Sequence, residues 1–185
     1  MEIQEDYESV TKLDISRKEL TELPSWVSEC HNLKELDCSW NHITQLNNLP
    51  QTLEKLNCWN NKITELNNLP PRLTELICKF NNITDLNNLP QTLEKLDCSN
   101  NHITQLDNLP QTLKNLDCYR NQITQLDNLP LTLKELSCEN NKIANLGNLP
   151  ETVNSLWCTK NPFKYEFEPT LENIKNYNNQ NKLQT

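Results

Sequence analysis

LEKLDCSNNHITQLDNLPQT, residues 93–112, is one copy of a 20-residue unit that recurs along most of this chain. The unit reads L-x-x-L-x-C-x-x-N-x-I-x-x-L-x-x-L-P-x-x. Three of its positions stay the same over successive units, from Leu36 to Leu156, from Cys38 to Cys158 and from Asn41 to Asn161. A fixed period near 20 residues predicts a solenoid, in which each repeat contacts mainly its neighbours. Such a fold offers an extended surface, which favours binding over catalysis.

The composition agrees with a thin solenoid. Only 35% of the 185 residues are hydrophobic and the mean hydropathy is -0.76, because each coil buries a thin core. The formal net charge of -8 is spread through the repeats. It argues against binding to nucleic acid, which needs a basic stripe, and against anionic membrane surfaces. It is compatible with a basic partner, although a solvated acidic surface is the simpler interpretation.

No targeting or membrane signal is evident in the sequence. No apolar run approaches the roughly 20 residues of a transmembrane helix, and residues 1–8 are acidic and lack the apolar stretch of a signal peptide. We therefore expect a soluble, cytoplasmic protein.

Each unit predicts one short strand. Leu36-Asp37-Cys38 alternates between apolar and polar residues, as does a strand with one buried face. Stacked units then form a parallel sheet of about eight strands. The return segment carries Leu-Pro in nearly every coil, and Pro fixes φ and removes a donor. We expect that side to be extended or a single turn, with Asn and Pro making the turns because Gly147 is the only glycine.

The file of cysteines is predicted to be reduced and buried. Neighbouring Cys in parallel strands lie about 4.8 Å apart and point the same way, which fits a disulfide poorly. A straight file offers at most two thiols near one point, so it does not make a zinc site. Cys30 lies off the file beside His31, with no further ligands near it in sequence. We expect no metal, no cofactor and no catalytic thiol.

The repeated Asn is the polar exception in the buried pattern. An amide supplies donors and an acceptor, so one Asn per coil can satisfy backbone groups where adjacent coils turn.

These residues resemble the leucine-rich repeat family. The unit looks most like the 20-residue class of secreted bacterial effectors, and similar Cys- and Asn-rich versions occur in giant DNA viruses of amoebae. The resemblance implies an α/β-type right-handed superhelix with the sheet on the concave face. Two features depart from the family pattern. The first unit, residues 10–32, is longer and has Lys18 in place of Asn. In addition, most members carry Leu or Val where this chain carries Cys.

The domain organisation follows from where the repeat begins and ends. Residues 1–32 form an N-terminal cap and a longer first repeat, and residues 33–163 are the 20-residue repeats. Residues 164–178 are predicted to be a helical cap over the last coil, because Leu171, Ile174 and Tyr177 have helical spacing after Pro169. A docking helix for a partner is the alternative. The polar residues 179–185 are predicted to be a disordered tail.

Side chains that point outward from the strands and the turns after them decide the function. Trp40, Trp59, Ile77 and Phe80 fall in three consecutive coils and could form one patch. Aromatic residues and Arg are enriched at interaction hot spots. The alternative is that each side chain lies flat and only shields the sheet. The full set of candidate partner-binding residues is Trp40, Trp59, Ile77, Phe80, Tyr119, Arg120 and Trp157.

Carboxylates and histidines are weaker candidates. Asp37, Asp97 and Asp117 share one column, and the neighbours Asp97 and Asp117, flanked by Lys95 and Arg120, could do acid–base work or hold a cation. On an open, wet sheet such residues more often keep the surface soluble. His42 and His102 are three coils apart and cannot meet. We assign no catalytic residue.

We therefore predict a non-enzymatic module that binds a protein partner on the concave face. The resemblance suggests a microbial protein that acts on host proteins, in which case it would work in a host cytoplasm. One alternative is the recognition half of a ubiquitin ligase whose catalytic domain is absent here. Another is a structural or virion component. An exposed sheet edge would also permit a homodimer.

Overall fold

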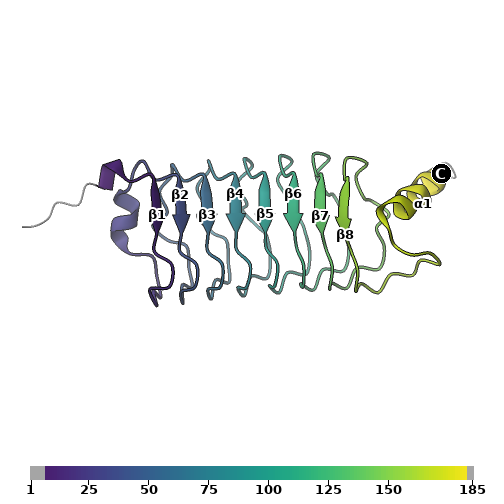
Figure 1. The fold of residues 1–185 in the computed structure, drawn as a ribbon, viewed down its shortest axis with the longest axis horizontal. Coiled ribbons are helices and arrows are strands. Elements are labelled where there is room, and N and C mark those ends of the chain that lie inside the picture. Colours follow the sequence, from purple (N-terminus) through teal and green to yellow (C-terminus); the bar gives the residue numbers. More distant parts are fainter. Residues whose placement is uncertain (1–6, 183–185) are drawn as a thin grey trace, which may run out of the picture.

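Eight short parallel strands form a single sheet in the computed structural model, which describes residues 7–182 (Figure 1). The strands are β1 (Lys12–Asp14), β2 (Glu35–Asp37), β3 (Lys55–Asn57), β4 (Glu75–Ile77), β5 (Lys95–Asp97), β6 (Asn115–Asp117), β7 (Glu135–Ser137) and β8 (Ser155–Trp157). Two 3₁₀ helices, η1 (Tyr7–Ser9) and η2 (Ser25–Glu29), lie at one end, and α1 (Leu171–Lys182) lies at the other. The expected solenoid is confirmed.

The register follows the sequence period. Leu36 pairs with Leu56 and Leu56 with Leu76, and the strands follow one another in chain order. The ladder continues past the strands, since the N–H of Trp40 donates to the carbonyl of Trp59 at 2.8 Å. Residues 20 apart therefore lie side by side at about 4.8 Å.

The core is a narrow layer of the repeated apolar side chains. Leu53, Cys58 and Ile63 are fully buried, as are their counterparts in the neighbouring coils. Segments with the Leu-Pro pair form turns, in which the N–H of Leu53 donates to the carbonyl of Pro50 at 3.2 Å. Within the described coils, no helix forms on this side of the repeats, as we predicted.

All eight cysteines are unpaired and buried. Some thiols donate to the backbone of the next strand, as Cys118 does to the carbonyl of Ser137 at 3.2 Å. Burial raises the pKa of the Cys38 thiol to about 12, with the charge of Asp37 adding to the shift. These thiols are core residues and poor nucleophiles.

The Asn file links successive coils. The Asn101 amide donates to the carbonyls of Cys78, Cys98 and Ser99 at 3.0–3.2 Å. Its Oδ1 accepts the N–H of Ile83 at 3.0 Å. One side chain thus satisfies backbone groups of two coils, and the predicted inward-facing Asn file is confirmed.

Turns without glycine rely on residues with positive φ. Asn48, Asn68, Asn88, Asn108 and Asn128 on the return side have φ of 57–64°, a conformation that Asn tolerates better than most residues. The second residue after Cys, or after Ile15 in the first coil, is also left-handed. These residues are Arg17, Trp40, Asn60, Phe80, Asn100, Arg120, Asn140 and Lys160.

The N-terminal end is closed by the long first repeat. Tyr7 stacks on Trp26 at 5.5 Å between ring centroids, and Val27 in η2 is fully buried. Because β1 pairs with β2, this unit is a coil of the solenoid as well as its cap.

The C-terminal end is closed by an aromatic segment and then by α1. Phe167 stacks on Tyr165 at 4.7 Å between ring centroids, and Ile174 of α1 is fully buried. The helix begins at Leu171, later than the predicted start of the cap at residue 164, because residues 163–167 form the aromatic segment. It continues to Lys182, so the prediction of a disordered tail from residue 179 is wrong for residues 179–182. Residues 183–185 lie outside the described residues.

Within residues 7–182, no helix combines the length and the apolar character that crossing a membrane requires.

Candidate partner-binding surface

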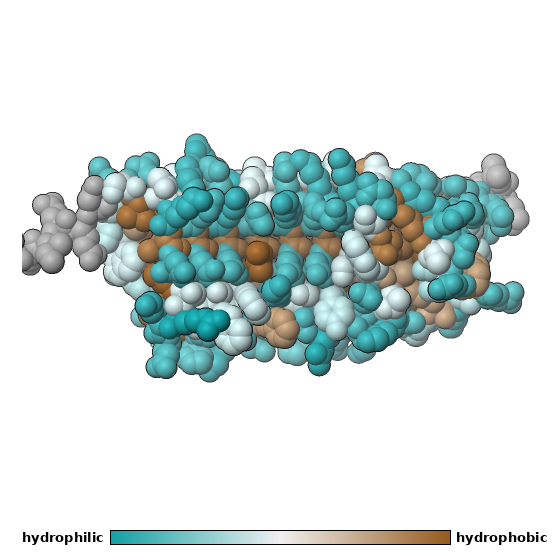
Figure 2. All heavy atoms as spheres, viewed as in Figure 1, coloured by the Kyte–Doolittle hydropathy of each residue, from teal (hydrophilic) through white to brown (hydrophobic). Residues whose placement is uncertain are grey.

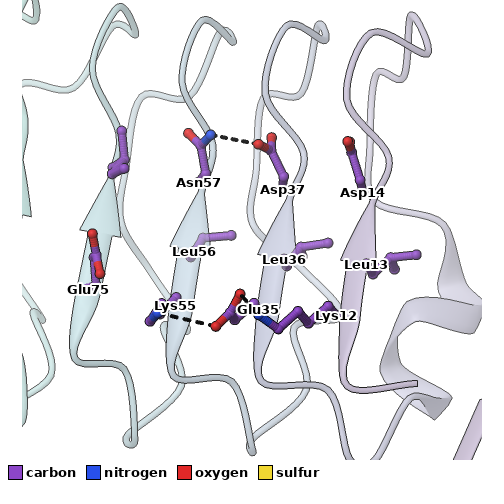
Figure 3. A pocket seen from close by; sticks show the side chains of 11 residues that line it. Lys12, Leu13, Asp14, Glu35, Leu36, Asp37, Lys55, Leu56, Asn57 and Glu75 are labelled. Carbon is purple, nitrogen blue, oxygen red and sulfur yellow. Dashed lines mark hydrogen bonds and ion pairs between the residues drawn. The ribbon is translucent and has the colours of Figure 1, made fainter. Parts of the chain in front are cut away.

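The exposed face of the sheet carries two rows of side chains, one on each side of the buried Leu row. The row before Leu begins with Lys12, Glu35 and Lys55 (Figure 3). Glu35 pairs with both lysines, at 2.9 Å and 3.2 Å, and their hydrogen bonds lower its pKa. Exposed pairs of this kind add little stability, so this row mainly orders the surface.

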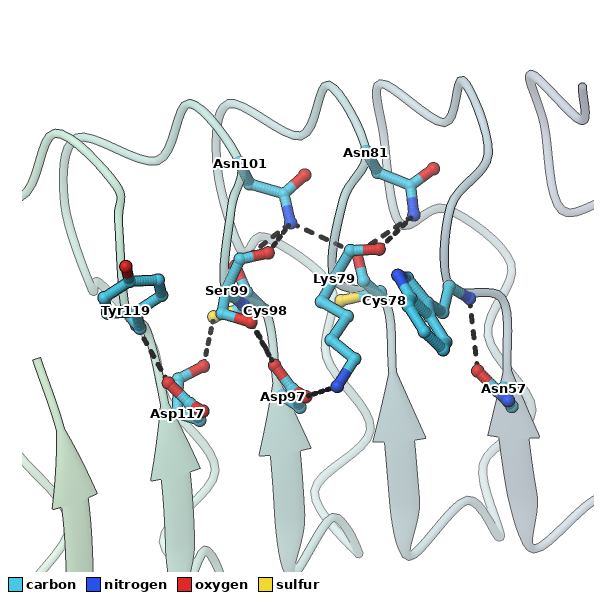
Figure 4. Close-up of polar contacts among 11 residues, drawn as sticks. Asn57, Cys78, Lys79, Asn81, Asp97, Cys98, Ser99, Asn101, Asp117 and Tyr119 are labelled. Carbon is cyan, nitrogen blue, oxygen red and sulfur yellow. Dashed lines mark hydrogen bonds and ion pairs between the residues drawn. The ribbon is translucent and has the colours of Figure 1, made fainter. Parts of the chain in front are cut away.

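The row after Leu closes the turns that follow the strands. Asp37 and Asp117 each accept the N–H of the residue two positions later, at 2.9 Å. The carboxylates thus have a structural role. Asp97 pairs with Lys79 at 3.2 Å (Figure 4), a different cation from the Lys95 and Arg120 that we predicted beside it. Lys79 lies in the turn after β4, in the coil that precedes Asp97, and its side chain reaches across to that carboxylate.

The two neighbouring carboxylates differ from free ones in their surroundings. Burial raises the pKa of Asp117, a hydrogen bond from Tyr119 opposes this shift, and the charge of Asp97 adds to it. Among the described residues, no group of three or more His, Cys, Asp or Glu side chains is arranged to hold a metal ion.

Between the two rows, the sheet face is shallowly hollowed. One hollow of about 380 Å³ lies over β1–β4, and a second of about 280 Å³ lies over β4–β8. Figure 2 shows an apolar stripe along this face, with hydrophilic side chains on both sides. Ile77 lines both hollows and Trp157 lines the second. Trp157 is 51% exposed, so the C-terminal cap leaves it accessible.

Three aromatic side chains form a continuous cluster in the turns after β2, β3 and β4. The ring centroids of Trp40 and Trp59 are 5.3 Å apart, and those of Trp59 and Phe80 are 6.2 Å apart. Two cations cover the cluster, with Arg17 at 5.1 Å from the Trp40 ring and Lys79 at 5.0 Å from the Trp59 ring. We call these five residues the aromatic rim.

The structure divides the predicted patch into separate groups. Trp40 and Phe80 are 43% and 46% exposed, and Trp59 lies half-buried between them. Ile77 belongs to the sheet face. Tyr119 and Arg120 are in the coil of β6, and the coil of β5 separates them from Phe80.

Sequence reasoning missed both cations of the rim. Arg17 and Lys79 occupy the same columns as the aromatic residues. The signal was therefore present, because a cation one coil away from an aromatic side chain is within reach of its ring.

The backbone of this rim does not favour bulky side chains. Trp40 and Phe80 of the rim, and Arg120 in the same column, have φ of 53–55°, a region that costs a residue with a Cβ roughly 1–2 kcal/mol. Asn60, Asn100 and Asn140 fill the same position in the alternate coils. Bulky residues at a position suited to Asn are a candidate functional feature, since strained residues cluster at such sites.

Comparisons with known proteins identify the family to which this chain belongs. A family model described as leucine-rich repeats in two copies matches residues 71–111 and 91–131. The solved leucine-rich repeat domain of a Shigella effector is 31% identical, with a TM-score of 0.76. The match covers 90% of this chain and 76% of that one. The chain belongs to the leucine-rich repeat family.

Two other solved structures are similar to parts of the chain. YopM from Yersinia enterocolitica is 40% identical with a TM-score of 0.69, over 77% of this chain and 31% of YopM. The functional domain of InlJ from Listeria monocytogenes, described as including a cysteine ladder, is 30% identical. Its TM-score is 0.64, over 83% of this chain and 40% of that domain. This chain thus spans about a third of YopM. No match was found among curated protein sequences.

Proposed function

We propose that this chain is a protein-recognition module, and that the aromatic rim and the adjoining sheet face bind its partner. The carrying observation is the cluster of Trp40, Trp59 and Phe80, in which two rings are more than two-fifths exposed. Exposed, contiguous aromatic surface in a mostly hydrophilic protein is typical of an interaction site.

Further residues extend this surface along the solenoid. Ile77 and Trp157 line the second hollow, and Tyr119 and Arg120 continue the line of the rim. The similarity to bacterial effector structures supports a partner that is a host protein and a site of action in a host cytoplasm. The open, shallow hollows support binding without catalysis, because neither encloses a substrate.

Affinity capture with paired variants tests the proposal. Wild-type protein and the Trp59→Ala/Phe80→Ala variant are used as bait in lysate of a host cell, followed by quantitative mass spectrometry. The matched control is Leu131→Ala/Gln111→Ala, which removes side chains from the return side, where Leu131 is 74% exposed.

We expect at least one protein to be recovered by the wild type and the control but lost by the rim variant. Recovery of the same proteins by all three baits would refute the assignment of the rim. Circular dichroism of each bait establishes that the solenoid is intact, so that lost capture is not lost folding.

A further inference from the structure

The turns after the strands carry a charge opposite to that of the whole chain. Three positions of each coil follow the strand on either side of the inward Asn: the first and second residues after Cys and the residue after Asn, with the equivalent positions in the first coil. Together they hold six cations and two anions, Glu19 and Glu139, so their net charge is 6 - 2 = +4 in a chain of net charge -8. The cations are Arg17, Lys62, Lys79, Arg120, Lys142 and Lys160.

The return segments carry charge of the opposite sign. The second and fourth residues after the repeated Ile are exposed in every coil from residue 45 to residue 147. They include Glu65, Asp85, Asp107 and Asp127 and no cation, which gives a net charge of -4. The turn positions beside the aromatic rim are therefore basic and these return positions acidic, and the strand row next to the turns adds Asp14, Asp37, Asp97 and Asp117.

Most of the basic side chains lack an acidic partner. Among residues 7–182, no ion pair joins Lys62, Arg120, Lys142 or Lys160 to a carboxylate, although Lys142 bonds the Gln122 amide oxygen at 3.2 Å. Lys79 is the exception, because it pairs with Asp97. A partner with carboxylates can reach these cations without displacing an internal pair.

The line of cations has a defined length. Arg17 and Lys160 lie in the first and last coils, and seven steps of about 4.8 Å separate them by roughly 34 Å. An extended peptide rises about 3.3 Å per residue, so about ten residues span the line.

In the middle of the line, the two residues after Cys98 are smaller than Phe80 and Arg120 in the neighbouring coils, and we call this place the gap. Ser99 is buried and Asn100 is half-exposed, so the coil of β5 presents small side chains between Phe80 on one side and Arg120 on the other. An apolar side chain of a partner placed on Asn100 would lie beside both the aromatic rim and the cation of Arg120.

We propose that the partner segment is an acidic, extended peptide with apolar side chains, bound along the basic turns that follow the strands. This inference rests on the proposed function and specifies the chemistry of its partner. Carboxylates meet Lys62, Arg120 and Lys142, and apolar side chains meet Trp40, Phe80 and the gap at Asn100. Opposite charges favour encounter and specificity, and they make binding dependent on salt.

Fluorescence anisotropy with defined probes tests the inference. The first probe is a labelled twelve-residue peptide of Glu and Ser with Phe at positions 4 and 8. The second replaces every Glu with Lys. The third is a twelve-nucleotide single-stranded oligouridine, because aromatic and basic side chains can also bind RNA.

We expect the acidic peptide to bind at least tenfold more tightly than the Lys peptide, and more weakly when NaCl rises from 50 to 200 mM. Lys62→Glu/Arg120→Glu should weaken this binding at least tenfold. Arg72→Glu/Lys164→Glu makes the same charge change at exposed residues outside these positions and should change it less than twofold. Asn100→Trp fills the gap at a φ that Trp40 already adopts, and it should weaken binding as well.

Equal binding of the acidic and Lys peptides, or tighter binding of the oligouridine, overturns the inference. The two proposals can fail separately. A partner captured from lysate that requires Trp59 and Phe80 but is retained by Lys62→Glu/Arg120→Glu leaves the recognition function standing and removes the acidic segment.

Discussion

Asn100 and Asn101 are the same residue at adjacent positions, yet the fold uses them differently. Asn101 is buried and forms four hydrogen bonds to the backbone of two coils. Asn100 contributes its positive φ, and the same position holds Trp40, Phe80 or Arg120 in other coils. The inner position requires Asn because the side chain there hydrogen-bonds the backbone of two coils. The outer position requires only a backbone conformation, so its side chain is free to recognise a partner.

The largest expected effect concerns the buried file of cysteines, because six of its thiols are almost fully buried. Burial raises the pKa of Cys38, Cys58, Cys78, Cys98, Cys118 and Cys138 above the usual value of 9.0. The folded pKa exceeds the unfolded pKa, so the stabilisation from these thiols is complete below pH 9 and is lost as the pH rises above it. Each thiol loses about 1.4 kcal/mol per pH unit there.

Six thiols together lose roughly 8 kcal/mol per pH unit, which is comparable to the whole stability of a typical domain. We expect cooperative unfolding between about pH 9 and pH 10.5, measured by circular dichroism with urea titrations at each pH. Cys78→Ala/Cys98→Ala should flatten the slope by about a third. A free energy of unfolding that stays constant from pH 8 to pH 10 would contradict the assignment of these thiols to the dry core.

The difference between Asn100 and Asn101 predicts a second, smaller effect. Asn101→Leu leaves buried carbonyls and one N–H without partners and should destabilise the protein by about 1–3 kcal/mol. Asn100→Leu keeps these hydrogen bonds and faces only the strain of positive φ, so it should lose about 1 kcal/mol. Urea denaturation measures both, and equal losses would show that the inner amide has no special role.

The smallest effect comes from the outer position alone. Arg120→Asn places a residue that tolerates positive φ where Arg has a φ of 53°, and it should stabilise the protein by roughly 0.5–1 kcal/mol. Arg120→Ala removes the same charge without this relief and serves as the control. A gain for Ala as large as that for Asn would show that charge repulsion, and not backbone strain, limits stability there.

The inner positions could be predicted from sequence and the outer ones only in part. Leu36, Cys38 and Asn41 recur with one period, so their burial and register follow from the repeat. Side chains on the outside do not recur, and their directions depend on turns that the period does not describe. Lys79 therefore reaches Asp97 and the Trp59 ring instead of standing alone.

The two ends were harder to predict for a different reason. A cap occurs once, so no repetition averages out its local signals. The aromatic residues Phe163, Tyr165 and Phe167 pack against one another without a helix, and the polar residues 179–182 continue α1 although their composition suggests a tail. The helix in this segment spans Leu171–Lys182, so its limits differ from the predicted residues 164–178.

Because the coils share one register, the distance between two side chains in the same column is a multiple of one fixed step. Deleting or duplicating one 20-residue unit would leave every remaining side chain in its column and change the distance between any two flanking recognition residues by one fixed step. Such proteins can be matched to ligands of different length by editing whole units, without redesigning a core or a turn.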